Sequence, residues 1–366
     1  MKIKLLFTKP KTYVLAIFSL LLLGAVPYFA GSGLTTPEPL GKYLNNNFPA
    51  IVSTPDGLPY EPIFPNLTFD SPLTFNELPT GNRIMVGQRD GKIYWFNKND
   101  NVSQKNMLLD LSNKVGVVWD GGFLGLEIHP EFGTPGKNYF YMYYTSKDGN
   151  GNDYPNAFVS GFGCYQEDYW GGFLYLKRFE VDPITFTLDL SSELTMLKLR
   201  MFSSTHRGGA LEFGDDGFLY LSTGEQSAYS KSQNITTNLD GGVLRIDVDQ
   251  DPTKSHDPIR TLDTGRFADE ISGVGYGIPN DNPFLSSTGL NFEEYYTIGN
   301  RNPHRMTKDA LTGTMYIGEI GEGTHEEINV VSKGKNYGWP VYEGNVAGPR
   351  PNCPGPDSGS YNNMPH

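Results

Sequence analysis

Residues 205–225 of this chain, THRGGALEFGDDGFLYLSTGE, contain the pattern that decides the fold. Apolar and polar residues alternate on both sides of Asp216-Gly217, a favoured pair for a tight hairpin turn. His206 precedes the first predicted strand, and Glu225 closes the second. The stretch predicts a β-hairpin, and it leaves two roles open for His206: a structural residue at the start of a blade, or a base that faces a substrate.

Similar hairpin patterns recur along the chain. RIMVGQRDGKIYWFN (residues 83–97) turns at Asp90-Gly91, and HRMTKDALTGTMYIGEIG (residues 304–321) turns at Thr312-Gly313. Aromatic-rich strands lie between the hairpins, and amphipathic helix patterns are scarce. One such unit per blade, with insertions, predicts an all-β protein built as a β-propeller. The alternatives are a β-sandwich and a β-helix, and the spacings are too long and irregular for the β-helix.

The composition agrees with many short strands joined by turns. The 366 residues include 43 glycines, 26 prolines, 22 tyrosines and 22 phenylalanines. The formal net charge is −12, and no basic stripe is present, so nucleic acid is excluded as a partner class. An acidic surface mainly favours solubility, and it also suits a cationic partner or a divalent metal.

The N-terminal 32 residues have the pattern of an export segment. Four lysines within the first eleven residues precede the apolar run TYVLAIFSLLLLGAVPYFA. We expect a signal peptide or an N-terminal membrane anchor over residues 1–32, and hence a periplasmic or extracellular protein. Residues 33–70, rich in Pro, Asn and Gly, are interpreted as a linker, and residues 71–366 as the propeller.

The two cysteines, Cys164 and Cys353, are compatible with export. They lie far apart in the sequence, so their pairing stays open. Neither belongs to a CxxC motif, and a zinc or thioredoxin-like site is therefore not supported.

Three stretches carry residue types suited to chemistry. The imidazole of His206 suits proton abstraction from a hydroxyl. In IGNRNPHR (residues 298–305), Arg301 offers fixed, permanently charged donors for a carboxylate or an oxyanion, and Asn302 follows it. The Gly-rich stretch GEIGEGTHEEINVV (residues 318–331) supplies oxygen ligands of the kind that calcium prefers, including Glu322 and Glu327.

Six segments in this order resemble the soluble quinoprotein glucose/sorbosone dehydrogenase family, which includes the aldose sugar dehydrogenases. They are GGFLGLEIHPEF, HRGGALEFGDDGFLYLSTGE, GGVLRIDVD, YGIPNDNPF, RNPHR and EEINVVSKGKNYGWP, and they span roughly residues 80–345. The resemblance implies a six-bladed β-propeller that is exported. It also implies pyrroloquinoline quinone with Ca²⁺ as cofactors, and oxidation of the C1 hydroxyl of an aldose to the lactone.

The resemblance also assigns roles by position. His206 corresponds to the general base, and Glu225 to the carboxylate that orients it, where glucose dehydrogenases of this type carry aspartate. Arg301 and Asn302 correspond to cofactor-binding residues, with Arg301 holding the quinone oxygen and stabilising charge. The backbone carbonyls of Gly321 and Glu322 correspond to ligands of the cofactor's Ca²⁺. In the same way, Glu327 and Tyr337 correspond to ligands of a separate structural Ca²⁺.

The chain ends shortly after the NYGWP motif, before the blades that in the family supply further cofactor contacts and the sugar-site wall. We therefore expect a propeller that is incomplete at the C-terminus. The expected partners are a sugar substrate and an electron acceptor such as a cytochrome or a quinone. Two alternatives stay open: a non-enzymatic binding propeller, as in animal hedgehog-interacting proteins, and a Ca²⁺-dependent carbohydrate-binding or lactone-hydrolysing propeller.

Overall fold

The computed structural model describes residues 62–153, 171–262 and 269–349. The predicted export segment (residues 1–32), most of the predicted linker, Cys164 and Cys353 lie outside these ranges. Within them, no helix is long and apolar enough to cross a membrane. The helical element η2 (Tyr229–Gln233) is a single short 3-10 segment.

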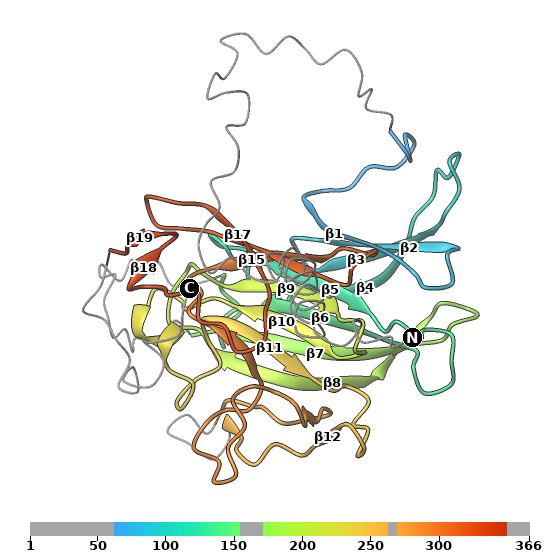
Figure 1. Cartoon of the computed structure of the whole chain (residues 1–366). Helices are drawn as coiled ribbons and strands as arrows, with labels where there is room; N and C mark the ends of the chain where they lie inside the picture. Colours follow the sequence, from blue (N-terminus) through green and yellow to red (C-terminus); the bar gives the residue numbers. More distant parts are fainter. Residues whose placement is uncertain (1–61, 154–170, 263–268, 350–366) are drawn as a thin grey trace, which may run out of the picture. The chain divides into compact units, whose positions relative to one another are not determined.

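The described residues form four consecutive antiparallel sheets (Figure 1). The first contains β1 (Pro72–Glu77), β2 (Arg83–Gln88), β3 (Lys92–Asn97) and β4 (Asn106–Asp110). The second contains β5 (Phe123–Ile128), β6 (Tyr139–Thr145), β7 (Phe173–Val181) and β8 (Leu188–Arg200). The third contains β9 (Gly208–Phe213), β10 (Leu219–Thr223), β11 (Gly242–Ile246) and β14 (Tyr295–Ile298). The fourth contains β15 (Pro303–Lys308), β16 (Met315–Glu319) and β17 (Glu327–Val330).

Two small ribbons accompany these sheets. One pairs β12 (Ser255–His256) with β13 (Ile278–Pro279), and the other pairs β18 (Tyr342–Glu343) with β19 (Val346–Ala347). The first lies in the long connection between β11 and β14 of the third sheet, and the second follows β17 of the fourth.

The first strand of each sheet lies beside the first strand of the next, so that β1, β5, β9 and β15 are successive neighbours. Each sheet is a meander that runs outward from this inner strand. This is the blade arrangement of a propeller, and the all-β propeller-like fold is confirmed with four blades. The count of six blades and the incompleteness at the C-terminus stay predictions.

The predicted hairpin turns are confirmed. β9 and β10 pair on either side of Asp216-Gly217, where the N–H of Phe218 donates to Oδ1 of Asp216 at 3.1 Å. β2 and β3 pair across Asp90-Gly91, and β15 and β16 pair across Thr312-Gly313. The glycine of each pair has a left-handed φ, which explains why glycine stands there.

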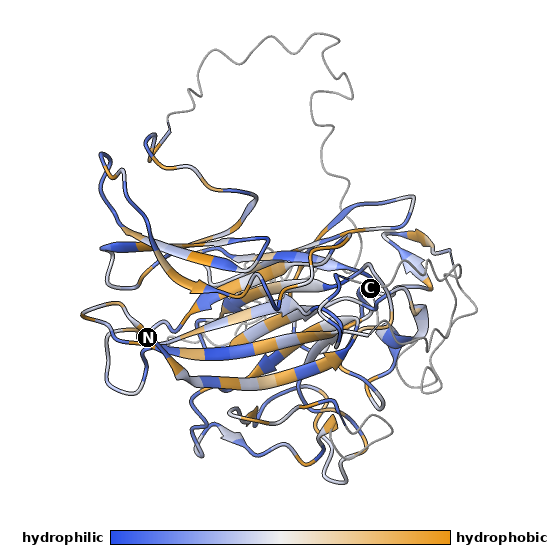
Figure 2. Ribbon diagram, turned by 180° about the vertical axis from the view of Figure 1, so that it is seen from behind, coloured by the Kyte–Doolittle hydropathy of each residue, from blue (hydrophilic) through white to orange (hydrophobic). Residues whose placement is uncertain are grey.

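Apolar residues recur along the strands (Figure 2). The buried apolar side chains form clusters between neighbouring blades. One cluster joins the second and third blades and includes Tyr141, Leu176 and Leu221. Another joins the first and second blades and includes Ile93, Phe140 and Phe179. Aromatic residues supply much of this core, because each one buries a large apolar area between two sheets.

Neighbouring inner strands approach each other very closely. A Cβ atom added at Gly125 of β5 would lie 2.2 Å from the carbonyl oxygen of Gly209 in β9. No real side chain tolerates such a contact with backbone, so glycine is required at this position.

Replacement of Gly125 by alanine therefore tests the inter-blade packing. We expect Gly125→Ala to lower the free energy of unfolding by about 1–3 kcal/mol, because the inner strands must move apart. Gly149→Ala is the matched control, since a Cβ at Gly149 meets nothing within 4 Å. Urea denaturation monitored by tryptophan fluorescence measures both, and equal stabilities of the two variants would contradict the packing argument.

Candidate active site

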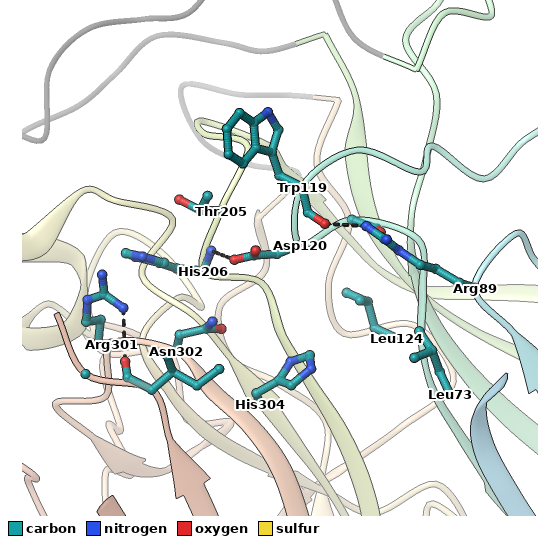
Figure 3. Close-up of a pocket in the computed structure, with 13 residues that line it drawn as sticks. Leu73, Arg89, Trp119, Asp120, Leu124, Thr205, His206, Arg301, Asn302 and His304 are labelled. Carbon is teal, nitrogen blue, oxygen red and sulfur yellow. Dashed lines mark hydrogen bonds between the residues drawn. The ribbon is translucent and has the colours of Figure 1, made fainter. Parts of the chain in front are cut away.

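A pocket of about 530 Å³ lies at one end of the inner strands. All four blades contribute to it, and its lining includes Leu73, Asp120, Leu124, His206, Arg301 and His304 (Figure 3). Four of the residues singled out from the sequence therefore line one cavity: His206, Arg301, Asn302 and Gly321. This volume lies within the ordinary range of small-molecule sites.

His206 and Glu225 form a buried hydrogen-bonded pair. Nδ1 of His206 lies 2.6 Å from Oε1 of Glu225, and the glutamate is fully buried. The glutamate side chain therefore reaches the imidazole although it is one methylene longer than aspartate. Because a carboxylate oxygen accepts, Nδ1 donates in this pair, and Nε2 is the ring nitrogen left for another partner. No hydrogen bond among the described residues engages Nε2.

The backbone of His206 is held in a special conformation. Its φ is +56°, which is left-handed and uncommon for a residue other than glycine. The carbonyl of His206 passes close to Gly224, where a Cβ would lie only 2.1 Å from the oxygen. Two side chains bind the backbone on either side: Oδ2 of Asp120 accepts the N–H of His206 at 2.8 Å, and Oδ1 of Asn302 accepts the N–H of Gly208 at 3.0 Å.

A buried carboxylate, Glu319, organises the turn that carries Arg301 and Asn302. Its Oε1 accepts the backbone N–H groups of both residues at 2.7 Å, and its Oε2 accepts Nδ2 of Asn300 at 2.7 Å. Burial raises the pKa of Glu319 to about 7, an effect that the three hydrogen bonds counteract. Glu319 ends β16, and it links the fourth blade to the turn in front of β15.

The guanidinium of Arg301 faces the pocket without a carboxylate partner in the described part of the chain. Nη1 donates to the carbonyl oxygen of Ile320 at 3.0 Å, and the group lies 5.4 Å from the ring centre of Trp339. Nε is buried and has no hydrogen-bond partner. The arrangement leaves a positive charge available to an anionic ligand.

A second guanidinium, that of Arg89, lies across the pocket from Arg301 (Figure 3). Its Nε donates to the carbonyl oxygen of Gly121 at 3.1 Å, and its Nη2 donates to the carbonyl oxygen of Trp119. Among the described residues it forms no ion pair. Burial lowers the pKa of His304, which also lines the pocket, and the charge of its neighbour Arg305 lowers it further.

The loop Gly321–His325 is arranged around the carboxylate of Glu343. Oε1 of Glu343 accepts the backbone N–H groups of Glu322, Gly323, Thr324 and His325 at 2.6, 2.9, 3.1 and 3.4 Å. The hydroxyl of Thr324 donates to Oε2. Burial alone would raise the pKa of Glu343, but these donors outweigh it and hold the pKa at about 2. The side chain of Glu322 itself is exposed.

Glu327 and Tyr337, the residues expected at a structural Ca²⁺, lie outside the pocket. Glu327 accepts the N–H of Gly344 through Oε1 and Nδ2 of Asn329 through Oε2. The Tyr337 hydroxyl donates to the carbonyl oxygen of Val330. In the described ranges, no three His, Cys, Asp or Glu side chains are grouped closely enough to hold a metal ion. Calcium bound at Gly321 and Glu322 would therefore depend on backbone carbonyl oxygens.

Sequence reasoning missed Arg89, Trp119, Asp120, Glu319 and Glu343. Asp120 lies shortly before β5 and Glu319 ends β16, each in a glycine-rich stretch, WDGG and GEIG. This context was an available signal. Glu343 carried no such signal, because its donors come from a loop about twenty residues earlier.

The fold and the pocket together define a class, a propeller with a histidine–carboxylate pair and two arginines at the ends of its inner strands. The model of the Glucose / Sorbosone dehydrogenase family matches residues 69–276 and 270–351. The chain belongs to this family.

Several relatives support the assignment. The HIPL2 protein of Arabidopsis thaliana is 28% identical over 340 residues, which cover 84% of this chain and 46% of that protein. Aldose sugar dehydrogenase YliI of Escherichia coli (strain K12) is 24% identical over 276 residues, covering 74% of this chain and 59% of that protein. The chain thus spans about half the length of the curated relatives that it matches.

A solved structure shares the fold. The PQQ-bound form of aldose sugar dehydrogenase from Streptomyces coelicolor superposes with a TM-score of 0.52 at 23% identity. The match covers 77% of this chain and 66% of that chain. At this identity the likeness supports the propeller fold, and it does not by itself carry the activity over.

The low pKa of Glu343 predicts a specific acid sensitivity. Its pKa lies below the unfolded value of 4.5, so its contribution to stability is present above pH 4.5 and is lost as the pH falls towards 2. We expect Glu343→Gln to lower the free energy of unfolding by up to about 3 kcal/mol at pH 7, and the difference from the parent to shrink between pH 5 and pH 2.

Urea denaturation of both proteins across this pH range measures the difference. Glu322→Gln, an exposed carboxylate on the same loop, is the control and should track the parent at every pH. If the difference in the free energy of unfolding between Glu343→Gln and the parent stayed constant from pH 7 to pH 2, the loop would not be what holds the Glu343 carboxylate ionised.

Proposed function

We propose that this protein is an exported quinoprotein sugar dehydrogenase that oxidises the C1 hydroxyl of an aldose to the lactone. The observation that carries the proposal is the His206–Glu225 pair, whose contact through Nδ1 leaves Nε2 for a substrate in a pocket that also contains Arg301. A base that removes the hydroxyl proton and a positively charged group for the electron acceptor are the two parts that this oxidation needs.

The residues present fit an anionic cofactor such as pyrroloquinoline quinone. Arg89 and Arg301 both donate only to backbone carbonyl oxygens in the described residues, so neither charge is neutralised by a carboxylate. Nε of Arg301 is a buried donor that still lacks an acceptor. When bound, the quinone would supply the acceptor for the hydride that leaves C1. Arg301 and Asn302 would hold it, with Ca²⁺ at the carbonyl oxygens of Gly321 and Glu322.

The protein's own residues then carry out the proton chemistry. Glu225 accepts the hydrogen of Nδ1, so that Nε2 is the ring nitrogen that can accept a proton, and the buried carboxylate fixes the orientation of the ring. Nε2 takes the proton of the C1 hydroxyl as the hydride leaves the same carbon. The carboxylate of Glu225 stabilises the imidazolium that forms. The guanidinium of Arg301 would stabilise the negative charge that develops on the bound quinone.

Location and electron transfer belong to the same proposal. Residues 1–32 would direct export to the periplasm or the exterior, with or without a retained anchor, and a cytochrome or a quinone would receive the electrons. The proposed structural Ca²⁺ at Glu327 and Tyr337 would stabilise the fourth blade.

The rival function is a binding propeller without redox activity. It is favoured by the long match to the HIPL2 protein, whose name does not describe a dehydrogenase. Reconstitution of the full-length protein with pyrroloquinoline quinone and Ca²⁺ separates the two. Sugar-dependent dye reduction supports the dehydrogenase, whereas failure to retain the quinone after desalting supports the binding propeller.

The proposed base gives a direct prediction. We expect His206→Ala to lower turnover of the reconstituted protein by about 10²–10⁴-fold, because the hydroxyl proton loses its acceptor. Quinone absorbance after desalting should stay close to the parent value, since the imidazole acts on the substrate. Steady-state dye reduction with a panel of aldoses measures the effect.

Two further variants control this experiment. His256→Ala alters a histidine on β12 that does not line the pocket, and it should leave turnover unchanged. Arg301→Ala should weaken both quinone retention and turnover. Parent-like turnover of His206→Ala would remove His206 from the mechanism.

A further inference from the structure

Arg89 fastens the turn in front of β5 to the first blade. It follows β2 directly, and its guanidinium donates to the carbonyl oxygens of Trp119 and Gly121. The carbonyl of Arg89 also accepts the N–H of Phe123 at 2.9 Å, at the start of β5. The residue enclosed between the two guanidinium contacts is Asp120 (Figure 3). Arg89 therefore holds the backbone at the residue before Asp120 and at the residue after it.

Asp120 in turn binds the third blade. Its Oδ2 accepts the backbone N–H of His206 at 2.8 Å, across 86 positions in the sequence. The left-handed φ of His206 costs on the order of 1 kcal/mol or more, and it persists only where the surroundings favour it. An acceptor aimed at the N–H supplies such an influence, because a buried donor left without a partner costs about 1–3 kcal/mol.

The place of the imidazole depends on this backbone conformation. The direction of the Cα–Cβ bond relative to the neighbouring strands changes when φ moves from the left-handed to the ordinary region. Glu225 fixes the ring through Nδ1, and Asp120 fixes the backbone through the N–H. These two contacts together determine where Nε2 lies in the pocket.

We propose that Asp120, clamped by Arg89, is a positioning residue that sets the location of the His206 imidazole for proton transfer. The inference rests on the proposed function, because it assigns Asp120 a role in the same reaction. Asp120 acts through the backbone of His206, and the role needs only a hydrogen-bond acceptor at Oδ2.

Amide hydrogen exchange at His206 and steady-state kinetics, on the same full-length variants, test this inference. In Asp120→Ala we expect the His206 amide to exchange at least tenfold faster than in the parent, with or without quinone. We also expect kcat to fall by about 100-fold with a KM within a few-fold of the parent, since a small misplacement of a catalytic group has effects of this size.

Asp120→Asn is the conservative variant, because its amide oxygen still accepts the N–H. In this variant the exchange rate of the His206 amide and kcat should both stay within about threefold of the parent values. If the role depended on the carboxylate charge, Asp120→Asn would lose as much as Asp120→Ala. Asp90→Asn alters the half-buried neighbour of Arg89, which pairs with Lys92, and should change neither quantity. Amides of β10 serve as an internal reference, so that a variant that fails to fold is recognised.

Several results would overturn the inference. One is an Asp120→Ala protein with fast exchange at His206 and parent-like kcat; another is unchanged exchange in that variant. Equal losses in Asp120→Asn and Asp120→Ala would assign the effect to charge and overturn positioning by the hydrogen bond. If the parent itself does not oxidise any aldose with quinone and Ca²⁺, the proposed function fails and the positioning role falls with it. An active parent with unaffected Asp120 variants refutes the positioning role alone.

Discussion

The carbonyl oxygen of Gly209 occupies the space in which the side chain of residue 125 would begin. This contact brings the inner strands of the second and third blades together, and it leaves little room along the centre of the described sheets. The cavity lined by all four inner strands measures about 200 Å³, whereas the pocket at their ends measures about 530 Å³. Close packing of the strands thus concentrates the usable space in the turns that precede them, and these turns carry the polar residues.

Turns of this kind have no strand partner for their N–H groups, and buried or half-buried polar groups must be satisfied in another way. Side-chain oxygens do so repeatedly around the pocket. Glu319 accepts the N–H groups of the turn before β15, and Glu343 accepts those of the loop after β16. Asp120 accepts the N–H of His206, and Asn302 accepts the N–H of Gly208. The backbone of His206 and Gly208 in the third blade is therefore fixed by acceptors from the second and fourth blades, whereas Glu319 fixes a turn of its own blade.

The sequence predicted the strand-level features well, because alternation and Asp-Gly turns are local signals. The hairpins around Asp216-Gly217 and Asp90-Gly91 formed as expected, and so did the propeller-like arrangement. His206 and Arg301 could be singled out from residue type and resemblance, and the structure brings them to one pocket. Arg89 and Asp120 could not be found in this way, since their importance lies in contacts to backbone atoms far along the chain. Local patterns do not encode such contacts, which exist only after the blades have packed.

The left-handed backbone at position 206 also affects which residues could replace histidine there during evolution. Glycine tolerates this conformation best, and asparagine tolerates it better than most residues. Asp120 and Asn302 bind the N–H groups of residues 206 and 208, which remain available whatever side chain position 206 carries. A lineage released from the need for proton transfer would therefore keep the fold and drift towards glycine or asparagine here. The residue at this one position would then separate descendants that still depend on a base from those that have lost the chemistry.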